Sequence, residues 1–257
     1  MKKLSKNTIF LSICGLAALI VSWLVAYLVI QDDYVLPSPW ATAKAAVGLL
    51  GQGGFYLVLI STLGRAALAF VVAFVFGVGF AVIAYLLPSF EKFLRGIIAV
   101  LRALPTMAAL LLILLAAEKL GGSEYLPPVV IGGLTLFPML YTAAYSALSS
   151  VDKDLLEMSR VYKVPTSVQV KKLYLPSALP ALCKEGVAAL SFSLKLIVSA
   201  EVLALTSQSI GGLMQTANVG YEIAEMTALT AIVCLLGILI EVVGVWLVKA
   251  WEDRRCA

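Results

Sequence analysis

Long apolar runs separated by short polar segments dominate the pattern of this chain. Six of the runs reach the roughly 20 residues with which a helix crosses a bilayer. We therefore predict an all-α, polytopic membrane protein with six transmembrane helices in a single domain, residues 1–257, with a core bundle at about 56–248. The predicted spans are Ile9–Ile30, Tyr56–Leu87, Phe93–Ala117, Leu126–Leu148, Ala178–Leu205 and Ile223–Val248.

Composition and charge support this class and indicate an orientation. Only 13% of the residues are charged, whereas a soluble domain has about 25%. Of the 19 Lys and Arg residues, Lys44 and Lys119 fall in predicted outer loops and Arg65 and Lys195 within spans. All others fall in segments that lie inside if the N-terminus is cytoplasmic. Because cytoplasmic loops are enriched in Lys and Arg, we predict two cytoplasmic termini and expect contact with lipid, not with nucleic acid.

Two features predict how the helices pack. Small residues recur at every fourth position of the second span, at Ala69, Ala73, Gly77 and Ala81, and such a stripe lets another helix approach closely in lipid. Proline residues in the third and fourth spans, within Leu101–Pro105 and at Pro138, are expected to interrupt or kink those helices.

The sequence offers no catalytic or metal-binding constellation. It contains no histidine, and its four cysteines fit no metal-ligand spacing. No nucleophile lies near a candidate base in the pattern. We therefore expect neither a catalytic residue nor a metal site, which disfavours an intramembrane enzyme.

A polar segment at about residues 150–176 interrupts the apolar pattern. Within it, Leu155, Met158 and Tyr162 fall at i, i+3 and i+7, which places them on one face of a short helix. An exposed apolar stripe with basic neighbours indicates a docking element. A solvated cytoplasmic loop is the alternative.

The same segment is predicted to contain two short helices. Val164 precedes Pro165, which favours a break at that point. Thr166–Gln169 has the spacing of a capping box, which predicts the start of a second helix. Leu175 and Pro176 are expected to end it.

This segment resembles the EAA loop of importer-type ABC transporter permeases. That loop has the pattern E-A-A-x-x-x-G followed further along by hydrophobic-x-L-P, and here Glu157 stands at the first position and Leu173–Pro176 at the end. The resemblance extends over essentially the whole chain to permeases for nitrate, sulfonate, taurine and thiamine-precursor uptake. The other similar segments are Leu36–Pro39, Leu101–Pro105, Phe137–Pro138, Ala200–Glu201 and Ile210–Leu213.

The resemblance implies the type I ABC importer permease fold in a bacterial cell membrane. It implies a homodimer of permeases, a cytoplasmic ABC ATPase and an extracytoplasmic substrate-binding protein. Since the chain lacks a G-x-x-x-x-G-K-[ST] motif, ATP and Mg would be bound by the ATPase. The cargo would be a small polar or anionic nutrient, similar to nitrate, sulfonates, taurine or thiamine precursors. The ATPase-coupling loop would contain Glu157, Met158, Ser159, Lys163, Pro165, Leu175 and Pro176.

The loop departs from the family pattern at three positions. Met158 and Ser159 replace the two alanines, and Lys163 stands at the glycine position. Glycine adopts a positive φ without steric cost, whereas lysine does not. We therefore hypothesise that Pro165 provides the bend instead.

A lysine within the fifth span is a candidate for the translocation path. Ser191, Lys195 and Ser199 lie at i, i+4 and i+8, and intramembrane charges normally face the bundle interior or water. We predict that these residues, with Glu201 as a further candidate, line a path for an anionic or polar substrate. A purely structural Lys195 is the equal alternative. Glu201 lies about 120° around the helix from Lys195, so we do not expect these two to pair.

Arg65 and Glu241 are further charges within spans. Arg65 is near the outer end of its span and is expected to extend its guanidinium to the interface. Glu241 is expected either to pair or to face a dimer interface, and the sequence does not distinguish these.

An ion-coupled secondary transporter is the rival class of protein. Such transporters usually show internal repeats and ionisable clusters near the membrane midplane. Neither feature is evident in this chain, which favours a permease that depends on a separate ATPase.

Overall fold

The structure is a computed structural model, and it describes the backbone of residues 6–256. Within this range the side chains of 6–13, 16, 153, 160, 255 and 256 lie outside the described part. Several basic residues on which the predicted orientation rests therefore fall outside it: Lys2, Lys3, Lys6, Lys153, Arg160 and Arg255.

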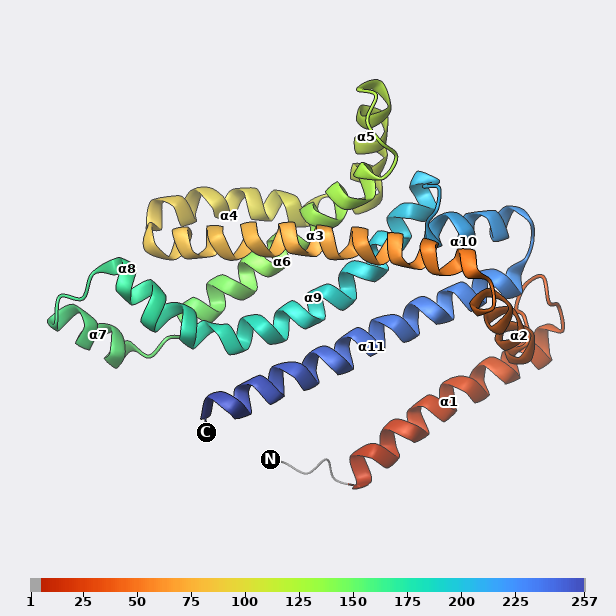
Figure 1. The fold of residues 1–257 in the computed structure, drawn as a ribbon, viewed down its shortest axis with the longest axis horizontal. Coiled ribbons are helices and arrows are strands. Elements are labelled where there is room, and N and C mark those ends of the chain that lie inside the picture. Colours follow the sequence, from red (N-terminus) through yellow and green to blue (C-terminus); the bar gives the residue numbers. More distant parts are fainter. Residues whose placement is uncertain (1–5, 257) are drawn as a thin grey trace. The chain divides into compact units, whose positions relative to one another are not determined.

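The described residues form helices joined by loops and contain no strand, which confirms the predicted all-α class (Figure 1). In chain order the elements are α1 (Lys6–Ile30), α2 (Pro39–Leu50), α3 (Gly53–Leu86), α4 (Pro88–Ala103), α5 (Thr106–Lys119), α6 (Leu126–Ser149), α7 (Lys153–Val161), α8 (Thr166–Gln169), the π-helical turn η1 (Val170–Tyr174), α9 (Leu175–Ala204), α10 (Ile210–Val219) and α11 (Ile223–Cys256).

These elements form two compact units. Unit 1 comprises Met1–Leu57 and Leu213–Ile232, and unit 2 comprises Val58–Gly212 and Val233–Ala257. In unit 1, the Ser38 hydroxyl caps α2 by accepting a hydrogen bond from the Ala41 N–H at 3.1 Å. All the candidate site residues lie in unit 2.

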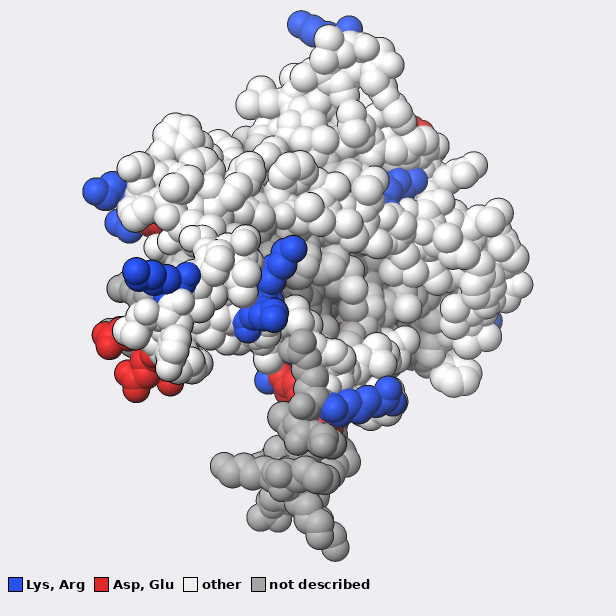
Figure 2. All heavy atoms as spheres, turned by 60° about the vertical axis from the view of Figure 1, so that its left-hand side comes forward, with Lys and Arg blue, Asp and Glu red and all other residues white. Residues whose placement is uncertain are grey.

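Fewer helices meet the requirements of a membrane span than the six predicted. α3, α6, α11 and a continuous helix over Thr166–Ala204 are long and apolar enough, and α4 with α5 gives a fifth, broken span. In α1 the described apolar stretch, Ala17–Ile30, is shorter than a span. Helices therefore occur at all six predicted positions, but only four or five qualify within the described residues. On the face drawn in Figure 2, most of the atoms belong to uncharged residues, and Lys, Arg, Asp and Glu gather in a few places.

The third predicted span is not one helix. α4 and α5 are bent by 94° at the break between Ala103 and Thr106. Pro105 has no N–H with which to continue the helix, and it favours the extended conformation found at Leu104 (φ −65°, ψ 124°). The predicted interruption by Pro105 is confirmed, and the predicted span Phe93–Ala117 corresponds to a bent pair of helices.

The stripe of small residues on α3 allows a close approach to α6. Ala69, Ala73 and Ala81 are buried. A Cβ added to Gly77 would lie 3.1 Å from the Cβ of Leu140, which is tighter than ordinary van der Waals contact. The predicted close packing is therefore confirmed, and α6 in turn packs extensively along α9.

The C-terminal end of α7 has a left-handed lysine. Lys163 has φ 50°, and the N–H of Val164 donates to the carbonyl of Ser159 at 3.0 Å. This is the hydrogen bond of a Schellman motif, which satisfies a carbonyl at the helix end and so offsets the steric cost at Lys163. The hypothesis that Pro165 replaces a left-handed residue is therefore wrong.

The start of the second short helix is confirmed, but its predicted cap is not. α8 begins at Thr166 after the break at Val164 and Pro165, and no side chain caps it. Gln169 instead donates from Nε2 to the carbonyl of Val164 at 2.8 Å. Pro165 already fixes the backbone conformation that precedes the helix, so Thr166 is helical and does not act as the cap.

The predicted helix end at Leu175 and Pro176 is wrong. α8 continues through η1 into α9 without a break. Pro176 lacks the N–H for an ordinary helical bond, and the wider π-helical turn that ends two residues earlier, at Tyr174, accommodates this loss. Tyr174 at the end of η1 is buried, with its ring edge-to-face against Tyr85 of α3 at 5.0 Å between centroids. The loop is thus joined to the long helix α9 through continuous helical backbone.

Candidate functional site

An apolar groove lies between α7 and α8. It has a volume of about 330 Å³. Met158 and Tyr162, two residues of the predicted stripe, are 54% and 75% exposed beside it. Exposed apolar patches of this kind mark interaction sites. The groove is lined by Leu155, Met158, Ser159, Tyr162, Val164, Val168, Gln169, Lys172 and Leu173.

The other residues of the predicted coupling loop surround this groove or lie beyond it. Glu157, Lys163 and Pro165 are exposed, and Glu157 forms no ion pair with another described side chain. Leu175 and Pro176 are half-buried at the start of α9.

The residues that were predicted to share one polar face of α9 lie in different surroundings. Ser191 is buried, and its hydroxyl donates to the carbonyl of Gly237 on α11 at 2.9 Å. Ser199 is exposed, and its hydroxyl donates to the carbonyl of Lys195 at 2.9 Å. A spacing of i+8 turns about 80° around a helix, so the first and last of these residues face different neighbours. Ser191 therefore joins α9 to α11, and its place on a translocation path stays a prediction.

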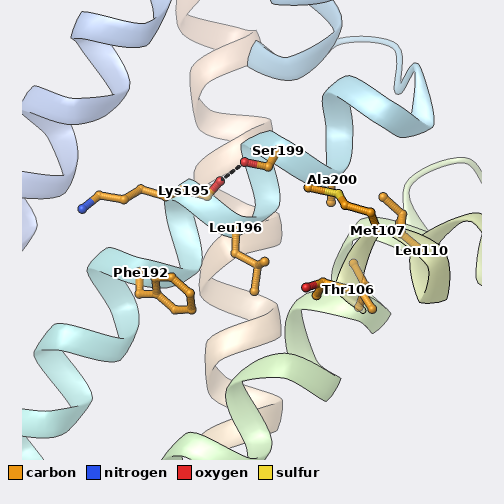
Figure 3. Close-up of a pocket in the computed structure, with 9 residues that line it drawn as sticks. Thr106, Met107, Leu110, Phe192, Lys195, Leu196, Ser199 and Ala200 are labelled. Atoms are coloured by element: carbon orange, nitrogen blue, oxygen red, sulfur yellow. Dashed lines mark hydrogen bonds between the residues drawn. The ribbon is translucent and has the colours of Figure 1, made fainter. Parts of the chain in front are cut away.

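A small pocket lies where α9 meets α5 and α6 (Figure 3). Its volume is about 160 Å³. The side chain of Lys195 extends away from Leu196 and Thr106 in Figure 3, and its Cε lies 3.2 Å from where a Cβ of Gly237 would be. The walls are apolar with three polar residues among them: Thr106, Met107, Leu110, Ile131, Phe192, Lys195, Leu196, Ser199 and Ala200.

Arg65 and Glu201 form a buried ion pair between α3 and α9. The side chain of Glu201 is fully buried and that of Arg65 is 11% exposed. The second carboxylate oxygen of Glu201 accepts hydrogen bonds from the Thr62 hydroxyl at 3.0 Å and the Gly211 N–H at 3.4 Å. The expectation that Arg65 reaches the interface is therefore wrong, because a carboxylate lies within its reach inside the protein. Glu201 is held within this network, and its place on a translocation path stays a prediction.

The same arginine holds the turn between α9 and α10. Arg65 donates to the carbonyl of Gln208 at 3.3 Å, and its guanidinium lies 4.7 Å from the ring centroid of Tyr125. Ser207 in this turn donates its hydroxyl to Glu124, and this hydrogen bond holds the pKa of Glu124 below its ordinary value. Side chains from α3 and from the segment just before α6 thus hold this turn.

The sequence contained a signal for this network that hydropathy did not reveal. Thr62 and Arg65 lie three residues apart and so share a face of α3. That face points at Glu201, which is 136 residues from Arg65 in sequence. Glu241, by contrast, is exposed on α11 and forms no ion pair with a described side chain.

The described side chains provide no obvious metal site. No group of three or more His, Cys, Asp or Glu residues among them is placed to hold a metal ion. The chemistry of unit 2 therefore consists of an apolar groove, a small pocket and a buried ion pair.

Comparison with known proteins gives one family and one curated relative. Residues 73–255, more than half of the chain, match the family of binding-protein-dependent transport system inner membrane components. The putative aliphatic sulfonates transport permease protein SsuC of Bacillus subtilis (strain 168) is 26% identical over 165 residues. The match covers 64% of this chain and 58% of SsuC, so the chain spans less than two thirds of that relative.

Solved structures share the fold at low sequence identity. A chain of the inward-facing MetNI methionine ABC transporter has a TM-score of 0.67 and 20% identity, over 76% of this chain and 96% of that one. A chain of a bacterial ABC transporter involved in the import of the acidic polysaccharide alginate has a TM-score of 0.68 and 15% identity, over 94% and 96%. The helices thus follow the type I ABC importer permease fold.

Proposed function

The chain belongs to the family of binding-protein-dependent transport system inner membrane components, and from this premise we propose that it is half of the pore of an ATP-driven importer. In this proposal the pore is a homodimer in a bacterial inner membrane, with both termini in the cytoplasm. An extracytoplasmic substrate-binding protein delivers the cargo. The chain itself catalyses no reaction.

The groove between α7 and α8 is the observation that carries this proposal. Its exposed apolar side chains, Met158 and Tyr162, suit a partner that buries them. We assign this partner as a cytoplasmic ABC ATPase, which binds ATP and Mg. Because α8 continues into α9, a shift of the loop on ATPase closure would move α9 with it.

The cargo we propose is a small polar or anionic nutrient, similar to sulfonates, nitrate, taurine or a thiamine precursor. The sulfonate permease SsuC supports the first of these. Ser199 provides one hydroxyl beside the pocket of Figure 3, and Lys195 provides one positive charge on the neighbouring side of α9, toward Gly237. Unchanged uptake by a Lys195→Met variant with normal ATPase activity would remove Lys195 from the path.

Co-purification tests the assignment of the groove. The Met158→Asp change places a charge in the groove and is expected to abolish recovery of the ATPase with the permease. Val161→Asp is the matched control, because Val161 is 77% exposed on the same helix but does not line the groove. Equal recovery of the ATPase with both variants would contradict the assignment.

A further inference from the structure

A second cavity, of about 360 Å³, lies among α4, α6 and α9, apart from the pocket of Figure 3. The break between α4 and α5 lies between the two: Arg102 precedes it and lines the second cavity, whereas Thr106 follows it and lines the pocket. Three hydroxyl side chains of α6 also line it, those of Thr135, Thr142 and Ser146.

Arg102 is held in place at the wall of this cavity. One of its terminal nitrogens donates to the Thr142 hydroxyl at 2.7 Å, and that hydroxyl donates to the carbonyl of Pro138 at 2.7 Å. A guanidinium has five N–H donors, and this is its only hydrogen bond within the described part of the chain. The remaining donors are available to a solute in the cavity.

Glu185 of α9 lines the same cavity with the opposite charge. Arg102 and Glu185 form no ion pair with each other or with any other described side chain. Both side chains are exposed where they line the cavity, and charges within membrane helices normally pair or face water. Because no described side chain neutralises either charge, both are free to pair with a solute that enters the cavity.

We propose that this cavity binds a small zwitterion, with its anionic group on Arg102 and its ammonium group on Glu185. A simple anion would pair with Arg102 but be repelled by Glu185. A simple cation would pair with Glu185 but be repelled by Arg102. Only a solute with both charges satisfies both side chains. The proposal narrows the solute class of the importer and rests on the proposed function for its role in transport, although binding itself needs no ATPase.

Two solutes that differ in one group test the proposal. 2-Aminoethanesulfonate is a zwitterion, and 2-hydroxyethanesulfonate keeps the sulfonate but replaces the ammonium with a hydroxyl. Binding of each labelled solute is measured by equilibrium dialysis against the full-length permease in lipid nanodiscs. The wild type is expected to prefer the zwitterion by about tenfold or more, the size of one charge-assisted hydrogen bond.

Variants assign each end of the solute. Glu185→Gln is expected to reduce this preference to about twofold or less, whereas Arg102→Gln is expected to weaken binding of both solutes about tenfold. Glu241→Gln and Arg95→Gln are the matched controls, because both are exposed, line neither cavity, and should leave binding unchanged.

Three results would overturn the proposal: equal binding of the two solutes by the wild type, no binding of either at millimolar concentration, or an unchanged preference in a folded Glu185→Gln variant. The importer assignment is tested separately: it fails if no ATPase co-purifies with the permease. Each outcome therefore identifies which of the two proposals fails.

Discussion

Removing one partner of the Arg65–Glu201 ion pair should destabilise the permease more than any surface change. Glu201→Leu leaves a guanidinium that is 11% exposed without its carboxylate. Breaking a buried pair in this way costs about 3–5 kcal/mol, because the remaining charge stays desolvated. We expect Arg65→Met to cost a similar amount, since it leaves a fully buried carboxylate.

The surroundings place the two variants at different points in this range. In Glu201→Leu, the Arg65 guanidinium keeps the carbonyl of Gln208 and the ring of Tyr125, which favours a cost near 3 kcal/mol. In Arg65→Met, Glu201 keeps only the Thr62 hydroxyl and a backbone N–H. Its cost should therefore lie nearer 5 kcal/mol.

A double-mutant cycle separates the ion pair from packing. The double variant removes both charges and keeps similar side-chain volumes, so its cost should fall short of the sum of the single variants by about 2–3 kcal/mol. The free energies of unfolding are measured in mild detergent by titration with sodium dodecyl sulfate, followed by circular dichroism.

An exposed pair provides the control. Arg95 pairs with Glu91 on one face of α4 at 2.8 Å, with Arg95 77% exposed. Neutralising Arg95 should lower the free energy of unfolding by less than about 1 kcal/mol. The account of the buried pair would be refuted if the single changes at Arg65 and Glu201 lowered the free energy of unfolding as little as this. It would also be refuted if the cost of the double variant equalled the sum of the two single costs.

Three further predictions concern the loops and the helix packing. Lys163→Gly removes the strain of φ 50°. It should raise the free energy of unfolding by about 1 kcal/mol, and the ATPase should still co-purify. Lys163→Val places a β-branched residue in the same conformation and should lower the free energy of unfolding. Gly77→Leu should push α3 away from α6, because even a Cβ at this site would lie 3.1 Å from Leu140. The yield of folded protein on size-exclusion chromatography should therefore fall. Gly79→Leu is the control and should leave the yield unchanged, because the structure has open space at Gly79. Because the folded pKa of Glu124 is lowered by the Ser207 hydroxyl, this hydrogen bond stabilises the fold above the ordinary carboxyl pKa and is lost as the pH falls through the lowered value. Ser207→Ala should therefore raise the pKa of Glu124, measured by NMR titration of carboxyl-labelled protein, and an unchanged pKa would contradict this.

The helices were predictable because hydropathy alone determines which segments are stable in lipid. The α3 stripe was predictable too, since small residues at every fourth position form a groove wherever the helix lies. The 94° bend at Pro105 was only half predictable: proline indicates an interruption, but the direction of the chain after it depends on the packing of α5 against α6.

The candidate site was less predictable, because its contacts join distant parts of the chain. The apolar stripe of α7 was evident from its spacing, and it does lie beside a groove. The partner of Glu201 was not evident, since Arg65 belongs to another helix and appeared free to reach the interface. Ser191 and Ser199 face different neighbours because spacing defines a helix face only over short distances, and it drifts by about 80° over eight residues.

The left-handed conformation of Lys163 could not be predicted from residue preferences. Residue preference favours glycine at such a position, but the hydrogen bond from Val164 to Ser159 stabilises the turn irrespective of the side chain at 163. Backbone hydrogen bonding therefore overrode the local preference, which no single residue in the sequence indicated.

The central claim is that this permease transports its solute at the expense of ATP hydrolysed by a separate subunit. Its most direct test is uptake of a labelled solute by proteoliposomes that contain the permease, its ATPase and the cognate binding protein. We predict uptake with ATP and Mg, none with a non-hydrolysable analogue, and none with the Met158→Asp variant. Uptake driven by a proton or sodium gradient without the ATPase would contradict the claim.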